Sequence, residues 1–138
     1  FAFYAITKFL SVQNTVEAGQ FVNSLQNDID KMWRSAQGSQ ELTYKLSSKV
    51  TYVCFVDFSS PKSGRHQSTY TELKRAFYGD ENLVFYPVGS LEIESTELKH
   101  IDLTSVTAEN NPFCIENTNG ELKITVKKDY GNDLVLIE

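Results

Sequence analysis

The chain has 138 residues, which suffices for one compact domain and is too short for two of ordinary size. Its composition, with 41% hydrophobic and 22% charged residues, is that of a globular protein and excludes a fully disordered chain. The net charge of −5 argues against general nucleic-acid binding, because that function needs a basic face.

Residues 1–12 form an unusually apolar start for a globular protein, and Lys8 carries their only charge. The chain begins with Phe1 instead of Met, so we expect that it was processed or trimmed. The large apolar side chains here surround a helix instead of lining one stripe, and they are Phe1, Phe3, Tyr4, Ile6, Phe9, Leu10 and Val12. A helix that is apolar all round is buried all round, so these residues need a partner.

Three partners fit this segment: the chain's own domain, a lipid membrane, and neighbouring copies of the same helix. No stretch of the sequence reaches the roughly 20 apolar residues of a complete membrane span, so a membrane contact would involve only the end of a longer helix. A head this small has no room to enclose the first turns. We therefore expect residues 1–12 to contact a membrane or neighbouring subunits. More specifically, we expect them to form a helix bundle in a homo-oligomer or filament.

Further along, apolar residues recur at helical spacing and predict that the helix continues. The positions that share one stripe are Ala18, Val22, Leu25, Ile29 and Met32. One helix from about residue 3 to about residue 35 would be about 50 Å long, so we expect part of it to project. The stripe predicts that the rest packs on a sheet, with Trp33 filling the junction. Gly38 is expected to cap the helix, which divides the chain into an N-terminal helix, 1–37, and a β-rich head, 38–138.

The sequence of the head predicts mainly strands. Residues 42–58 alternate with apolar side chains on both faces, which predicts a central strand covered on both sides. After it we expect, in chain order, a polar loop at 59–68, a short helix at 69–78, a buried strand at 83–88, one or two strands within 91–103, a loop at 104–111, a strand at 113–116, and a hairpin of 122–126 with 134–137. The fold class is therefore α+β: a long N-terminal helix followed by a small antiparallel or mixed sheet with one short helix.

Cys54 and Cys114 are the only two cysteines. In an extracytoplasmic protein such a pair predicts a disulfide, which here would tie the central strand to a late strand. The alternative is two buried free thiols in an intracellular core.

Motifs for a reaction are not found. His66 and His100 have no second ligand at metal-binding spacing, so we expect no metal and no cofactor. Asp57 follows the central strand, where it either caps the turn of Ser59 and Ser60 or acts in a site without an identifiable partner. We expect no enzyme activity, no nucleic-acid partner and no identifiable small-molecule substrate. A ligand, if there is one, would bind near the loop at 59–68, where Lys62 is basic.

In its first 35 residues, with an N-terminal Phe and a long helix before a β-rich part, the chain resembles type IV pilin-like proteins. It departs from bacterial members at Ala5, where they carry Glu, and at Lys8, which interrupts the apolar run. The segments at 24–40, 53–60 and 111–117 are similar to those of small archaeal surface proteins that carry a single N-terminal membrane helix. These resemblances imply a cell-surface location.

We therefore expect a non-enzymatic structural protein of the cell surface, anchored or assembled through its N-terminal helix. The alternative is an extracytoplasmic ligand-binding module or hydrolase-like enzyme with its site near residues 59–68. A deep polar pocket that contains Asp57 and His66 together would favour this alternative.

Overall fold

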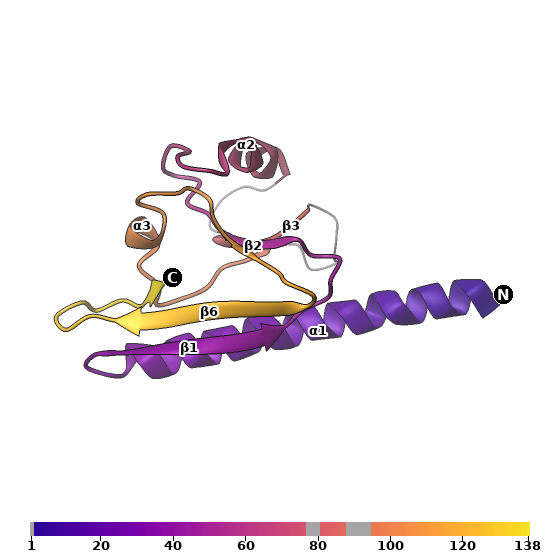
Figure 1. The fold of residues 1–138 in the computed structure, drawn as a ribbon, viewed down its shortest axis with the longest axis horizontal. Helices are drawn as coiled ribbons and strands as arrows, with labels where there is room; N and C mark the ends of the chain where they lie inside the picture. The colour runs from indigo at the N-terminus through magenta and orange to yellow at the C-terminus, as the bar shows by residue number, and fades with distance from the viewer. Residues whose placement is uncertain (1, 77–80, 88–94) are drawn as a thin grey trace.

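The structure of the protein is a computed structural model that describes residues 2–76, 81–87 and 95–138; of residues 2–15, 76 and 95 it describes only the backbone. Its first element is one uninterrupted helix, α1 (Ala2–Trp33), close to the predicted bounds. The C-terminal part of α1 lies along the strands, and its N-terminal part extends beyond them (Figure 1).

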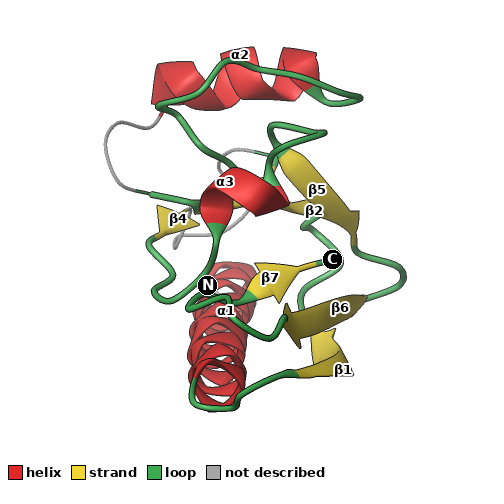
Figure 2. Cartoon of the chain, turned by 90° about the vertical axis from the view of Figure 1, so that its left-hand side faces the viewer, coloured by secondary structure: helices red, strands yellow, loops and turns green. Residues whose placement is uncertain are grey.

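Two antiparallel sheets form the head. One has the strand order β1 (Gly38–Lys45), β6 (Glu121–Lys128), β7 (Leu136–Ile137). The other has the order β4 (Ser95–Thr96), β3 (Leu83–Tyr86), β2 (Tyr52–Phe55), β5 (Phe113–Glu116). Two short helices, α2 (Gln67–Ala76) and α3 (Leu103–Val106), complete the described part, with α2 on the side opposite α1 (Figure 2). The predicted α+β class is confirmed.

The apolar stripe of α1 forms the centre of the main core. Ala18, Leu25 and Ile29 are fully buried, as the helical spacing predicts. Phe21, which the stripe omits, is also buried, and its ring lies 5.3 Å from that of Tyr44 and 6.0 Å from that of Phe85. Since Tyr44 belongs to one sheet and Phe85 to the other, α1 packs against both.

Strand β2 is central and buried on both faces, as predicted. Val53 and Phe55 join the core under α1, whereas Cys54 packs in a second cluster with Tyr70 and Leu73 of α2. The protein is thus layered, with α1 on one side of the β2 sheet and α2 on the other.

The structure corrects four expectations. Residues 42–58 do not form one strand, because a turn in which Val50 N–H donates to Ser47 O separates β1 from β2 and sends them into different sheets. Residues 104–111 are not only a loop: α3 begins there because the Asp102 carboxylate accepts the N–H of Ser105 and caps it. Residues 91–94 of the segment 91–103, which was expected to hold one or two strands, lie outside the described residues, and β4 in its described part has two residues.

The other two corrections concern the end of α1. Gly38 does not cap the helix but begins β1, and the Ser35 hydroxyl donates to Met32 O at 2.6 Å instead. Trp33 is not buried in the junction as expected: it is 37% exposed and stacks on the ring of His100 at the surface of the head, while Met32 packs against the core.

Candidate functional site

The segment predicted to contact a partner is the projecting part of α1. Its backbone is helical from Ala2 onward and leaves the head near Val16, which is 53% exposed, while Ala18 is fully buried. A groove of about 570 Å³ lies at this point between α1 and β1. The side chains of the predicted contact residues Phe3, Tyr4, Ile6, Phe9, Leu10 and Val12, and all of Phe1, lie outside the described residues.

Polar contacts fix the C-terminal part of α1 to the head. Gln26 forms a reciprocal pair of hydrogen bonds with the backbone of Lys99, at 2.8 and 3.1 Å. The Tyr44 hydroxyl donates to Asp28 at 2.6 Å, and burial together with this bond raises the pKa of Tyr44. These contacts hold the helix in one orientation, so its projecting part has a rigid base.

Cys54 and Cys114 are paired directly across β2 and β5 and form a disulfide, as predicted. The bond lies in the cluster under α2, and Cys54 is fully buried. A disulfide is typical of proteins that fold in an oxidising, extracytoplasmic environment.

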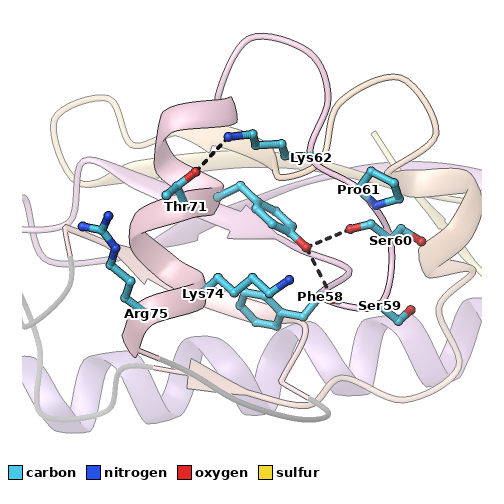
Figure 3. Close-up of a pocket in the computed structure, with 9 residues that line it drawn as sticks. Phe58, Ser59, Ser60, Pro61, Lys62, Thr71, Lys74 and Arg75 are labelled. Atoms are coloured by element: carbon cyan, nitrogen blue, oxygen red, sulfur yellow. Dashed lines mark hydrogen bonds between the residues drawn. The ribbon is translucent and has the colours of Figure 1, made fainter.

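A second candidate site lies on the opposite side of the head, and we call it the α2 cleft. It has a volume of about 640 Å³ and is formed by the loop after β2 and one side of α2. Its lining residues are Phe58, Ser59, Ser60, Pro61, Lys62, Tyr70, Thr71, Lys74 and Arg75 (Figure 3). Lys62, Lys74 and Arg75 are the charged members, and all are cationic.

The loop that lines the α2 cleft is held by a buried amide. Asn111 is 1% exposed; its Oδ1 accepts the N–H of Asp57 at 3.0 Å, and its Nδ2 donates to the carbonyls of Asp57 and Pro61 at 2.9 and 3.1 Å. The Tyr70 hydroxyl donates to Ser60 O at 2.8 Å. The shape of the cleft is therefore set by side chains from α2 and from the segment just before β5.

Asp57 caps the loop, in agreement with the simpler of its two interpretations. Its carboxylate accepts hydrogen bonds from the backbone and hydroxyl of Ser59 and from the hydroxyl of Ser60. Partial burial acts to raise the pKa of Asp57, but these hydrogen bonds outweigh it and lower the pKa below its usual value. Asp57 thus stays ionised and structural.

Neither Asp57 nor His66 lines the α2 cleft, so it is not the pocket containing both residues that would favour a ligand-binding module or enzyme. The His66 ring lies instead 5.2 Å from that of Tyr52. Within the ranges that the structure describes, no group of three or more His, Cys, Asp and Glu is placed to hold a metal ion. The sulfur atoms of the disulfide are not available as nucleophiles.

Sequence reasoning identified the loop of the α2 cleft but missed Tyr70, Lys74 and Asn111. Tyr70 and Lys74 are four residues apart in a helical segment, a spacing that places them on one face and is the signal that could have found them. Nothing local marks Asn111 as a partner of the loop, because the two are more than 50 residues apart.

Among the described helices, none combines the length and the apolar character that crossing a membrane requires. Comparisons of the chain with protein-family models, curated proteins and solved structures find no match.

Proposed function

We propose that this protein is a non-enzymatic structural subunit of the cell surface that associates with copies of itself through the projecting part of α1. The observation that carries the proposal is the continuity of α1: one helix is fixed in the core at its C-terminal end and leaves the head at its N-terminal end (Figure 1). Any load on the projecting part is thus passed directly to the head.

The sequence of the projecting part supplies the driving force. Its apolar residues lie on all sides of the helix, and the backbone runs away from the two sheets that could cover them. Burial of a large apolar side chain contributes roughly 1.5–3 kcal/mol, so several such residues per helix would drive bundling even after the costs of association. Lys8 fits a bundle by extending its amine to the surface of the bundle or to a backbone carbonyl.

The rest of the molecule fits a location outside the cytoplasm. The disulfide between Cys54 and Cys114 links β2 to β5, in the sheet against which α2 packs. Disulfides of this kind persist in oxidising environments. The resemblance of the first 35 residues to type IV pilin-like proteins, and of other segments to archaeal surface proteins, supports the same location. In the membrane-anchored form of this proposal, the projecting part of α1 contacts lipid instead of other copies of the helix.

A charge placed in the helix tests the proposal. Phe9→Asp would insert a carboxylate into the bundle, whereas Asn23→Asp puts the same group on an exposed position of α1 that already lies on the head. In sedimentation velocity without detergent, the unmodified chain and Asn23→Asp should associate and Phe9→Asp should be a monomer with the same melting temperature. Equal association of all three chains would refute assembly through this part of the helix.

A further inference from the structure

We infer that the α2 cleft binds a small organic anion, a carboxylate carried on an apolar ring. This inference is independent of assembly, because α2, which forms one side of the cleft, lies on the side of the head opposite α1 (Figure 2). Its volume of about 640 Å³ falls within the range of pockets that hold small molecules.

The charge of the cleft is opposite to that of the protein. The chain carries a net charge of −5, yet the charged residues of the lining are Lys62, Lys74 and Arg75. Among the residues that the structure describes, no carboxylate lies within ion-pair distance of these three. Like charges that lie close together, with no counter-ion among the described residues, attract an anion.

Two carboxylates near the cleft, those of Asp57 and Glu72, accept hydrogen bonds from other residues. Asp57 uses its carboxylate to hold the backbone and hydroxyls of the loop. Glu72 of α2 accepts a hydrogen bond from the Tyr86 hydroxyl at 3.1 Å, and neither residue lines the cleft. Of the carboxylates that the structure describes, neither of these two neutralises the cations of the cleft.

Two of the cations are held in place at the cleft. Lys62 Nζ donates to Thr71 Oγ1 at 3.1 Å, which ties the loop to α2 and leaves further donors on the ammonium. Lys74 Nζ lies 5.7 Å from the centre of the Tyr70 ring, a cation–π distance. Figure 3 shows Lys74 reaching from α2 toward Phe58, whereas Arg75 points away from it at the rim. Lys62 and Lys74 are thus the groups that would face an anion.

Aromatic and aliphatic surface supplies the rest of the cleft. Phe58 and Tyr70 lie with ring centres 6.0 Å apart, and Pro61 adds an apolar face beside them. A bare inorganic ion would leave this surface wet, while a ring attached to the anion would cover it. The combination of a cationic edge and an apolar wall is what selects a ring-bearing carboxylate.

The cleft is pre-formed, which lowers the entropic cost of binding. Tyr70 and Asn111 fix the loop through partly buried hydrogen bonds to the carbonyls of Ser60 and Pro61. Gly64 lets the loop pass close to Asn110: its φ is +78°, and a Cβ there would lie 2.9 Å from the Asn110 Cα. A ligand would therefore meet a loop that already has its bound shape.

Ligand-observed NMR on the full chain tests this inference with three probes. We use 2-naphthoate, its neutral amide, and acetate, which separate the contributions of charge and ring. We expect saturable binding of 2-naphthoate, weaker binding of the amide, and the weakest binding of acetate. Lys74→Met should weaken 2-naphthoate binding by at least about threefold and leave the amide unchanged. Lys49→Met removes a lysine from an exposed turn away from the cleft and should change nothing.

Circular dichroism of the variants establishes that each is folded before it is titrated. Equal affinity for 2-naphthoate and its amide would overturn the inference, as would an equal effect of Lys49→Met and Lys74→Met. Absence of saturable 2-naphthoate binding by the unmodified chain would overturn it as well. None of these outcomes bears on assembly, because no probe or variant touches α1.

Discussion

The imidazole of His100 lies with Nδ1 2.9 Å from the carboxylate of Asp30, although the two residues are 70 positions apart. The same ring stacks on Trp33 with a centroid distance of 3.7 Å and an interplanar angle of 5°. Together with Gln26, these residues form a polar latch between the end of α1 and the segment before α3. The latch fixes the C-terminal end of α1 to the surface of the head, where titration can reach it.

The latch makes stability depend on pH in a definite direction. The hydrogen bond from His100 lowers the pKa of Asp30 below its ordinary value of 3.8. A carboxyl with a depressed pKa in the folded state contributes stability above about pH 5, and this contribution is lost as pH falls through the folded pKa. We expect Asp30→Asn to cost about 0.5–1 kcal/mol at pH 6, as for partly exposed pairs, and much less near pH 3.

Urea unfolding at several pH values measures this difference. Asp133→Asn, in an exposed turn, is the matched control and should follow the unmodified chain throughout. A destabilisation by Asp30→Asn that is constant between pH 6 and pH 3 would show that the charge of Asp30 has no role in the latch.

The disulfide should contribute a large part of the stability of the head. It joins residues that are 60 positions apart, and closing a loop of that length contributes about 4 kcal/mol in the chain-entropy model. We expect the double variant Cys54→Ala, Cys114→Ala to unfold at markedly lower urea concentration. Mass spectrometry of unreduced, alkylated protein is the direct check: we expect no alkylated thiol, and two would refute the bond.

Asn111 should be sensitive to substitution, because it is buried and bonded to the loop through both ends of its amide. Asn111→Ala leaves the part-buried N–H of Asp57 and carbonyl of Pro61 without their partners, which costs about 1–3 kcal/mol per group. We expect a loss of at least about 2 kcal/mol in the free energy of unfolding. Asn23→Ala, at an exposed position of α1, should be neutral or slightly stabilising.

Leu25 tests whether α1 is part of the core of the head. It is fully buried between the sheets, so Leu25→Ala should cost about 2–5 kcal/mol. Val16→Ala removes apolar atoms from a residue that is 53% exposed and should cost little. If both variants unfold at the same urea concentration as the unmodified chain, α1 does not pack on the head as described.

The elements that the sequence predicts correctly are those with a strong local pattern. The stripe through Ala18, Leu25 and Ile29, the two-faced burial around Cys54 and the alternation in β6 all follow from periodicity. The division into two sheets could not be predicted, because β1 and β2 look like one long strand and only a three-dimensional partner decides where it breaks.

The candidate sites divide in the same way. The apolar segment at 1–12 and the loop at 59–68 are visible in the sequence, since each is set by composition. The α2 cleft depends on Tyr70, which reaches the loop from α2, and on Asn111, which reaches it from two residues before β5. Contacts between segments far apart in the chain carry no local signal, so the cleft becomes apparent only in the folded protein.

Static light scattering of the full chain and of a chain lacking residues 1–12 tests assembly most directly. Circular dichroism first establishes that the shortened chain keeps the head, whose described core begins at Ala18. Without detergent, we predict that the full chain has a molar mass several times that of one chain, increasing with concentration, and that the shortened chain is a monomer throughout. A full chain that is monodisperse and monomeric, or a shortened chain that associates equally, would refute assembly through the projecting helix.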